Sequence, residues 1–218
     1  MRALFERAPG RVERLFFEPR LKAELAAWCG ILGDARKPYR EADPATLERV
    51  GRTVRHGGVV AVALPQPIGA FDPQAPLVWA RDGNKPILVL DGVGNPHSLG
   101  AIAHSAAFLG VERVVLANRA EQAVPSDASY RIAEGGFEHL SLYRARLPAA
   151  FSPLRRAYRI VGAAPVGPAA PPDLCGERPR PSSSAMRKPV RALAACDAIA
   201  TIPGCGRMQS LNVAAAAS

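Results

Sequence analysis

The hydrophobic pattern is most regular in the middle of the chain, where it predicts a strand, a helix and a second strand. Residues 87–90 are a short, uninterrupted apolar run, which favours a strand that is buried on both faces. Apolar residues then recur at helical spacing over 99–109, with Ser98 as the expected N-cap and Gly110 as the expected C-terminal cap. A second apolar run occupies 111–117. Together they predict one βαβ unit, and the polar loop after its first strand is where open α/β sheets bind ligands.

Weaker apolar patterns on both sides of this unit predict more strands and helices. Residues 1–64 are expected to form a small α/β module, and 85–218 a larger α/β domain. Four prolines and few periodic apolar residues predict a semi-rigid linker over 65–84. The expected further strands are 14–17, 59–64, 139–143, 160–163 and 198–202, and the expected further helices are 3–8, 21–28, 131–136 and 151–159, with another that starts at Pro44.

The composition is that of an ordinary globular protein. The chain has 218 residues, of which 48% are apolar and 22% are charged. No apolar run approaches the length that spans a bilayer, and the first residues lack the apolar core of a signal peptide, so we expect no membrane partner. The four cysteines show neither C-x-x-C pairing nor nearby histidines. We therefore expect free thiols, a cytoplasmic location and no metal site.

Positive charge is concentrated in the first and last parts of the chain. The net charge of +9 divides into +4 for residues 1–60, −3 for 61–139 and +8 for 140–218. Basic surface on both sides of a neutral site suits the binding of a polyanion such as RNA. A biased base composition of the gene is the alternative explanation, since arginine outnumbers lysine 24 to 4. Charge alone leaves both explanations open.

The glycines of the central loop argue against two common phosphate-binding motifs. Gly92, Gly94 and Gly100 do not follow the G-x-G-x-x-G spacing, and no Gly-Lys-Ser/Thr follows them. A dinucleotide-binding fold and a P-loop are therefore not expected.

The same stretch instead resembles the first motif of the SpoU/TrmH-type RNA ribose 2′-O-methyltransferases. Residues 90–93 match the LDGV of that motif, Pro96 matches its proline, and residues 100–102 match its Gly-Ala-Ile. A second match is similar to the third motif of the family and covers 202–218, which read IPGCGRMQSLNVAAAAS. The second motif of the family is preserved only as a Gly-Glu pair, Gly176-Glu177. With the flanking segments, the resemblance extends over residues 12–218.

The resemblance implies a fold, a cofactor and a reaction. The implied fold is α/β: an N-terminal small α/β substrate-binding domain over 1–64, then a parallel-sheet α/β methyltransferase domain with a C-terminal trefoil knot at about 160–218. The implied reaction is methylation of a ribose 2′-hydroxyl in rRNA or tRNA with S-adenosylmethionine as methyl donor, carried out by a homodimer. The last expected helix begins at Leu211, and the given sequence supplies eight residues for it, 211–218. Members of the family usually continue that helix, so we expect a short dimer element here.

The resemblance also implies the roles of individual residues. The implied cofactor-binding residues are Gly176, Ile202, Met208 and Leu211, and the implied catalytic residues are Ser98, His104, Glu177, Ser210 and Asn212. Ser98 and His104 stand where the family has Asn and Arg. A histidine with a pKa near 6.5 is a reasonable base at neutral pH, but imidazole lacks the reach and the bidentate fork of a guanidinium.

Two functions from different classes remain open at this stage. One is the methyltransferase; the other is an RNA-binding relative that has lost methyl transfer, with Ser98 as a plain helix cap and His104 as a half-exposed helix residue. In the N-terminal module the basic residues are either phosphate contacts on an RNA-holding platform or an ordinary solvated face. The residues in question are Arg11, Arg14, Arg36, Lys37, Arg52 and Arg55.

Overall fold

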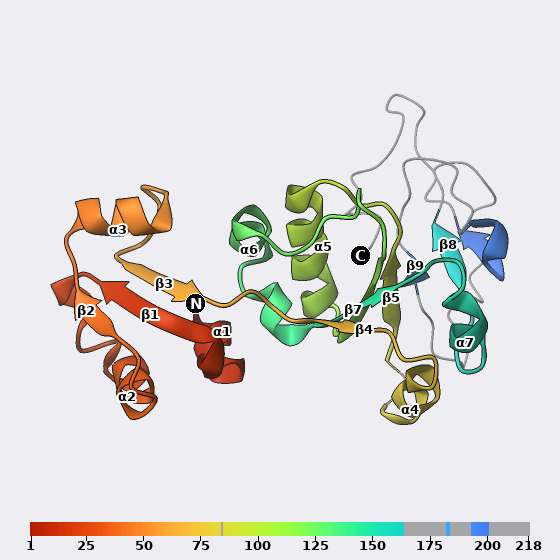
Figure 1. Cartoon of the computed structure of the whole chain (residues 1–218), viewed down its shortest axis with the longest axis horizontal. Coiled ribbons are helices and arrows are strands. Elements are labelled where there is room, and N and C mark those ends of the chain that lie inside the picture. Colours follow the sequence, from red (N-terminus) through yellow and green to blue (C-terminus); the bar gives the residue numbers. More distant parts are fainter. Residues whose placement is uncertain (84, 164–181, 184–192, 201–218) are drawn as a thin grey trace. The chain divides into compact units, whose positions relative to one another are not determined.

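Two compact α/β units make up the chain. The computed structural model describes residues 1–83, 85–163, 182–183 and 193–200. One unit comprises Met1–Pro65 and the other Gln66–Ser218, each with its own sheet (Figure 1). Both sheets are flanked by helices, so the predicted α/β class is confirmed. In the described part of the chain, no helix is long and apolar enough to cross a membrane.

The first unit is built on a three-stranded sheet with the order β2-β1-β3. The central strand β1 pairs in parallel with β2 and antiparallel with β3. Four of the six residues of β1 are buried: Val12, Leu15, Phe16 and Phe17. Because Leu15, Phe16 and Phe17 are consecutive, this end of the strand is covered on both faces. The bounds are β1 Val12–Phe17, β2 Tyr39–Glu41 and β3 Val59–Ala63, with helices α1 Arg2–Arg7, α2 Ala26–Asp34 and α3 Pro44–Gly51 and short 3-10 turns η1 Pro9–Arg11 and η2 Pro19–Leu21.

The helix expected over 21–28 lies further along the chain in the structure. A 3-10 turn, η2, and a turn precede it, and α2 runs through two glycines to Asp34. Glycine disfavours a helix interior, but Leu32 is fully buried in the core of this unit, and Phe5 stacks on Trp28 with ring centroids 4.4 Å apart. Tertiary packing therefore overrides the local propensity at this helix. The expected helices at 3–8 and from Pro44 and the expected strands at 14–17 and 59–64 are all present, with ends shifted by no more than two residues.

The second unit is organised around a seven-stranded parallel sheet. Its order is β10-β8-β9-β5-β6-β7-β4, and every neighbouring pair is parallel. The strands are β4 Ile68–Ala70, β5 Ile87–Leu90, β6 Arg113–Ala117, β7 Ser141–Ala145, β8 Val161–Ala163, β9 Ser182–Ser183 and β10 Ala198–Ala200. The strands predicted at 87–90, 111–117, 139–143, 160–163 and 198–202 all correspond to members of this sheet.

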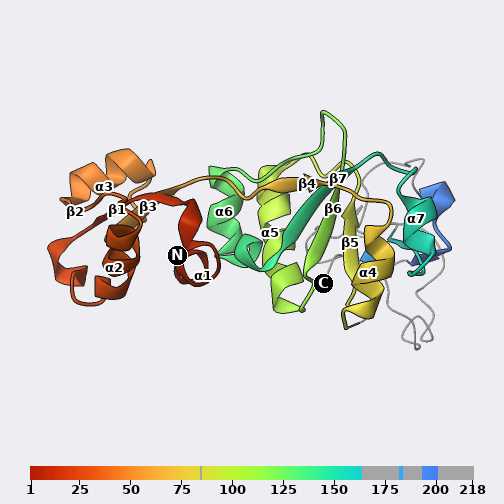
Figure 2. The same ribbon diagram turned by 60° about the horizontal axis from the view of Figure 1, so that its bottom comes forward.

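Helices cover both faces of the parallel sheet. Successive residues of β5 point to opposite faces: Leu88 and Leu90 join the core under α5 and α6, whereas Ile87 and Val89 join the core under α4 and α7. Figure 2 shows β5, β6 and β7 side by side between these helices. The helices are α4 Ala75–Arg81, α5 Pro96–Phe108, α6 Asp127–Ala133 and α7 Phe151–Arg155, with 3-10 turns η3 Gly136–His139 and η5 Leu193–Ala195.

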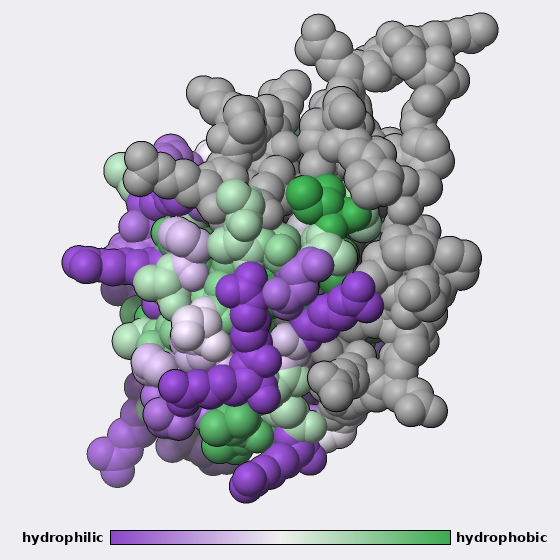
Figure 3. Space-filling model, turned by 90° about the vertical axis from the view of Figure 1, so that its right-hand side faces the viewer, coloured by the Kyte–Doolittle hydropathy of each residue, from purple (hydrophilic) through white to green (hydrophobic). Residues whose placement is uncertain are grey.

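An aspartate fixes β10 beside β8. The Asp197 carboxylate accepts a hydrogen bond from the Ile160 amide at 2.8 Å and pairs with the Arg155 guanidinium at 2.6 Å. Parallel pairing then joins Ala198 to Val161 and Ala200 to Ala163. The side of this unit that carries α7 is mostly hydrophilic, with smaller apolar patches among the polar side chains (Figure 3).

The structure differs from the prediction of a linker over 65–84. Residues 68–70 form β4, which extends the sheet beside β7, and residues 75–81 form α4, whose Trp79 is buried against Tyr143. The prolines fit because they stand where backbone N–H groups are not needed. Pro76 lies in the first turn of α4, and Pro67 precedes an edge strand.

A glycine contact sets the distance between α5 and α6. A Cβ added to Gly100 would lie 2.4 Å from the Ser129 carbonyl oxygen, which belongs to the backbone of α6 and cannot rotate away. We therefore expect Gly100→Ala to lower the free energy of unfolding by about 1–3 kcal/mol through overpacking, as measured by urea unfolding followed by circular dichroism. Gly30→Ala is the matched control: no atom lies within 4 Å of its added Cβ, so it should stabilise α2 by about 0.5–1 kcal/mol. Equal effects of the two changes would contradict the close approach of the helices.

Candidate functional site at the carboxyl edge of the parallel sheet

The order of the sheet reverses at β5. β6 and β7 follow on one side of it, whereas β8 and β10 lie on its other side with β9 between them and β5. Because all pairs are parallel, the carboxyl ends of β5, β9 and β10 lie along the same edge of the sheet. Open α/β sheets bind ligands at this edge, beside the strand where the order reverses. The loop that leaves β5 is therefore the first place to look for a site.

The loop from β5 to α5 turns sharply and ends at a helix cap. Gly92 has φ +82°, a left-handed conformation that favours glycine. Asn95 is the N-cap of α5, and its side-chain oxygen accepts a hydrogen bond from the His97 amide at 2.9 Å. The prediction of Ser98 as the N-cap is therefore wrong: Ser98 is the third residue of the helix, because Pro96 is favoured at the first helical position and Asn95 is as good a cap.

Gln122 holds this loop against the segment that follows β6. Its side-chain oxygen accepts hydrogen bonds from the amides of Gly92 (3.0 Å) and Val93 (3.2 Å), and its side-chain nitrogen donates to the Val93 and Ala123 carbonyls. The Ala123 amide also donates to the Val93 carbonyl at 2.9 Å. Gln122 is buried, so one amide side chain makes four hydrogen bonds, two accepted by its oxygen and two donated by its nitrogen, and fixes two loops.

The two loops approach each other at van der Waals distance. A Cβ added to Gly94 would lie 2.9 Å from the Glu121 carbonyl oxygen. Gly92, by contrast, has no atom within 4 Å of the position of an added Cβ and is exposed. One side of the loop is therefore closed by the neighbouring segment, and the space beside Gly92 is open to a ligand.

A buried ion pair lies directly behind the loop. Asp91 follows the last residue of β5 and is 3% exposed. Its carboxylate lies 3.2 Å from the Nε atom of Arg119, whose side chain is 31% exposed. Neither carboxylate oxygen accepts a hydrogen bond in the described part of the chain. Burial is the largest influence on this carboxyl and raises its pKa; the Arg119 guanidinium opposes that rise and Glu121 adds to it.

The two catalytic candidates that the structure describes both lie on α5. Ser98 is half-buried in the first turn, and His104 is exposed in the second half of the helix. Six residues at 1.5 Å each separate them by about 9 Å along the axis. In the described part of the chain, the His104 imidazole has neither a hydrogen bond nor an ion pair. The other implied site residues lie outside the described residues: Gly176, Glu177, Ile202, Met208, Ser210, Leu211 and Asn212. Most of the region expected to form the knot also lies outside them.

Two of the six predicted phosphate contacts are already engaged within the first unit. Arg11 donates from Nε to the Leu64 carbonyl at 2.9 Å. Lys37 donates from Nζ to the Gly10 carbonyl at 2.6 Å and to the Glu13 carboxylate at 2.9 Å. These contacts tie the start of β1 to its neighbours, and they explain the two basic residues without RNA. The other four predicted contacts, Arg14, Arg36, Arg52 and Arg55, are exposed.

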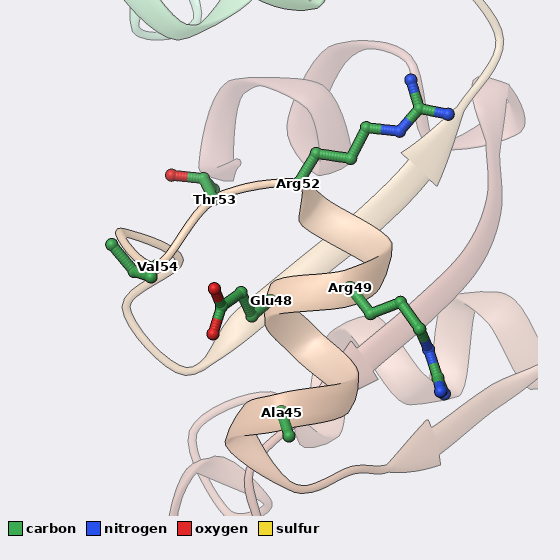
Figure 4. A pocket seen from close by; sticks show the side chains of 6 residues that line it. All are labelled: Ala45, Glu48, Arg49, Arg52, Thr53 and Val54. Carbon is green, nitrogen blue, oxygen red and sulfur yellow. The ribbon is translucent and has the colours of Figure 1, made fainter.

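A hollow at the end of α3 brings basic residues together. It is lined by Ala45, Glu48, Arg49, Arg52, Thr53 and Val54. Figure 4 shows Arg49 and Arg52 extending from α3 in different directions, with Val54 on the turn that follows the helix. Arg52 ends α3 in a left-handed conformation, φ +49°. Arg49 was not among the predicted contacts, although its spacing of three residues from Arg52 places both on one side of a helix.

Sequence reasoning did not single out the residues that fix the edge of the sheet. Asp91 reads as a strand terminator, and Arg119 and Gln122 lie in a polar stretch without periodicity. The position of Asp91, directly after a doubly buried strand, was the available signal. The sequence carries no such signal for Gln122, because its side-chain oxygen bonds to backbone amides 29 and 30 residues away.

An open parallel sheet with helices on both faces and a rigid loop at its reversal point defines a ligand-binding α/β domain. Residues 85–180 of the chain match the SpoU rRNA Methylase family. The chain is 31% identical over 162 residues to an uncharacterized tRNA/rRNA methyltransferase of Haemophilus influenzae, an alignment that covers 73% of this chain and 44% of that protein. It is 29% identical over 216 residues to the 23S rRNA (guanosine-2′-O-)-methyltransferase RlmB of a Burkholderia species, covering 95% of this chain and 85% of the relative.

A solved structure has a similar fold. The AdoMet-bound rRNA methyltransferase of Sinorhizobium meliloti superposes with a TM-score of 0.76 at 18% identity, covering 100% of this chain and 81% of that one. The chain spans less than half the length of the first curated relatives that it matches.

The Gln122 contacts predict a local effect on the β5–α5 loop. Gln122→Ala leaves the Gly92 and Val93 amides and the Val93 and Ala123 carbonyls without their side-chain partner. We expect the free energy of unfolding to fall by about 1–3 kcal/mol and hydrogen exchange at Gly92 and Val93 to accelerate. Gln74→Ala, at an exposed position where the side chain makes no capping hydrogen bond, should change neither. Unchanged exchange at Gly92 and Val93 would contradict the clamp.

Asp91 predicts a specific dependence of stability on pH. Because the folded protein holds the Asp91 proton more tightly than the unfolded chain, the free energy of unfolding falls as pH rises from the ordinary aspartate pKa, about 3.9, through the higher folded-state pKa. Asp91→Asn removes this slope. We therefore expect the stability of Asp91→Asn relative to wild type to increase with pH across this window in urea unfolding at a series of pH values. The exposed Asp34→Asn serves as control; parallel curves for wild type and Asp91→Asn would overturn the prediction.

Proposed function

We propose that the chain is an S-adenosylmethionine-dependent methyltransferase that modifies a ribose 2′-hydroxyl in structured RNA, rRNA or tRNA. The single observation that carries the proposal is the rigid, glycine-containing loop at the reversal point of the parallel sheet, in the stretch that matches the SpoU family. RlmB, to which the chain is similar over 95% of its length, is by name a 23S rRNA 2′-O-methyltransferase. The Sinorhizobium protein with the same fold was crystallised with AdoMet.

The described part of the loop is compatible with a ligand beside Gly92. No atom lies within 4 Å of the position of an added Cβ there, and the Gln122 side chain holds the Gly92 and Val93 amides. When bound, S-adenosylmethionine supplies a methyl group on a sulfonium. The residues proposed to hold it are Gly176, which follows β8 in the sequence, and Ile202, Met208 and Leu211, which follow β10. The carboxyl ends of β8 and β10 lie at the edge where the β5–α5 loop leaves the sheet.

The chain's own residues have to position the ribose and remove a proton. A ribose hydroxyl is a weak acid, so its oxygen becomes nucleophilic as a base takes its proton. We assign the base to His104, whose imidazole is exposed and uncommitted in the described part of the chain. Ser98, Ser210, Asn212 and Glu177 are proposed to orient groups beside the ribose, since alignment supplies much of the rate in a transfer of this kind.

The first unit is proposed to hold the RNA. The main candidates for phosphate contacts are the exposed arginines at the end of α3 and after it, Arg49, Arg52 and Arg55. Arg14 and Arg36 are also exposed and are further candidates. The second unit adds exposed Arg144, Arg146, Arg156 and Arg159. Guanidinium groups of this kind neutralise phosphates without reading sequence.

The oligomeric state and the cellular location are proposed from the similarity to the SpoU family. We propose a homodimer with a C-terminal trefoil knot that acts in the cytoplasm. The supporting observations are the SpoU match over 85–180 and the similarity to the Sinorhizobium fold over the whole chain.

The second candidate function is an RNA-binding protein of the same family without methyl transfer. It is favoured by Ser98 and His104, which stand in the positions where the first motif of the family has Asn and Arg. Calorimetric titration with S-adenosylmethionine separates the two functions, because the methyltransferase requires binding and the RNA-binding protein does not. Absence of binding at millimolar cofactor would overturn the methyltransferase.

Substitutions of His104 test its role as the base. Loss of a positioned base reduces a proton-transfer step by about 100-fold or more, so His104→Ala should lose at least that factor in transfer of labelled methyl to total RNA. His104→Arg should be more active than His104→Ala, since a guanidinium offers longer reach and a bidentate fork for positioning the ribose, although it does not accept the proton. His139→Ala, an exposed histidine in η3, is the control. Equal activity of wild type and both His104 variants would remove this residue from the chemistry.

A further inference from the structure

Among the arginines in the described part of the chain, Arg119 is the one whose ion-pair partner is a fully buried carboxylate. It follows β6 and meets the carboxylate of Asp91, which follows β5, and these two strands are neighbours in the sheet. Both residues therefore belong to the carboxyl edge, where the ligand site is proposed. The Asp91 side chain is 0% exposed and that of Arg119 is 31% exposed, so the pair runs from the interior to the surface.

The burial of Asp91 is costly unless it serves a purpose. A carboxylate taken out of water loses its hydration, and neither of its oxygens recovers a hydrogen bond in the described part of the chain. The Arg119 guanidinium is its one positively charged neighbour among the described residues. An apolar residue or an asparagine at position 91 would avoid the cost, which makes the pair weak as a device for stability alone.

The pair is also not needed to hold the loops together. Gln122 already joins the β5–α5 loop to the segment after β6 through four hydrogen bonds, and the Ala123 amide adds a fifth to the Val93 carbonyl. What the pair adds is a fixed position for the guanidinium. The carboxylate lies against Nε, on one edge of the planar group, and leaves the two Nη atoms for other partners.

In the described part of the chain the Nη atoms of Arg119 make no hydrogen bond. Glu121 lies 4.0 Å from Nη1, beyond hydrogen-bond distance, and its side chain is 64% exposed. The segment 61–139 has a net charge of −3, so this guanidinium is not part of a general basic surface. A fixed, half-exposed guanidinium with unused donors matches the planar oxygens of a carboxylate or a phosphate.

We infer that Arg119 binds an oxyanion of the ligand at the carboxyl edge of the sheet, and that Asp91 is the positioning residue that orients its guanidinium. The inference rests on the proposed function for the identity of the ligand. Two ligands of that reaction carry the required chemistry: the carboxylate of S-adenosylmethionine and a phosphate of the RNA near the reacting ribose. Both offer two oxygens in the geometry that the Nη atoms can engage.

The experiment compares four variants of the full chain with wild type: Arg119→Gln, Arg119→Lys, Asp91→Asn and the control Arg81→Gln. Arg81 is an exposed arginine at the end of α4, before β5 and thus toward the opposite edge of the sheet. The readouts are the melting temperature, the affinity for S-adenosylmethionine by calorimetry, the affinity for total tRNA and rRNA as a function of salt, and methyl transfer.

Arg119→Gln should lower the affinity for one of the two ligands by about tenfold or more, because a charge-assisted bidentate contact is lost. If the oxyanion is the cofactor carboxylate, S-adenosylmethionine binding falls and RNA binding does not. If it is a phosphate, RNA binding falls and the slope of log affinity against log salt decreases by about one. Arg119→Lys should be intermediate because it keeps the charge and loses the fork. Asp91→Asn should weaken binding of the same ligand, but by less than Arg119→Gln does. A residue with a merely structural role would affect the binding of both ligands and not of one.

The outcomes separate this inference from the proposed function. If wild type transfers methyl groups and Arg119→Gln matches Arg81→Gln in both affinities, the inference is overturned and the proposed function stands. If wild type neither binds the cofactor nor transfers methyl, but Arg119→Gln still loses RNA affinity and salt slope, the proposed function falls and the oxyanion contact stands. A third outcome is that Arg119→Gln and Arg119→Lys both lose affinity for both ligands and both have a lowered melting temperature. That outcome would assign the residue to stability and overturn the inference.

Discussion

Parallel pairing on both edges of β5 is the constraint on which the second unit depends. β5 is buried on both faces as well as paired on both edges, so its register with β6 and with β9 cannot shift without moving apolar side chains out of two cores. The same pairing sends the chain out of β5, β6 and β10 at one edge. Residues that are distant in sequence thus meet at that edge because of strand direction, before any loop chemistry is considered.

Close backbone contacts then make the edge rigid. Gly100 and Gly136 let α5 approach α6 and η3 until an added Cβ would collide with backbone atoms of the neighbouring element. Gly94 does the same between the two loops, and Gln122 adds hydrogen bonds to backbone groups that no helix or strand satisfies. A loop that binds a ligand through its backbone benefits from such fixed geometry, because little ordering remains to be done when the ligand arrives.

The sequence predicts those parts of this arrangement that are encoded locally. The doubly buried β5 and the apolar stripe of α5 are visible as patterns, and family motifs extend the prediction to residues that no periodicity marks. The start of α5 was misplaced because Asn95 and Ser98 are equally good caps, and only the position of Pro96 separates them. The segment 65–84 was taken for a linker because its strand and helix are short. Their stability comes from distant residues: Ile68 pairs with Leu142, 74 positions away, and Trp79 packs on Tyr143, 64 positions away. Gln122 and the Asp91–Arg119 pair are long-range contacts between polar side chains, and a single sequence carries no periodic signal for these.

The structure contains exposed surface arginines and one arginine that is held by a buried carboxylate. The first kind suits affinity for RNA, and the second suits the exact positioning of a ligand. Arg49, Arg52 and Arg55 are exposed on the surface of the first unit, which suits contacts to phosphates that do not depend on sequence and gives binding that weakens with salt. Arg119 is held at a defined point by a carboxylate that is itself buried. A mobile cation contributes attraction, whereas a fixed one contributes a reference point for the ligand. A reaction that needs a single hydroxyl to face a methyl donor depends more on the second kind, because a displacement of one ångström reduces the rate far more than the loss of a surface contact reduces binding.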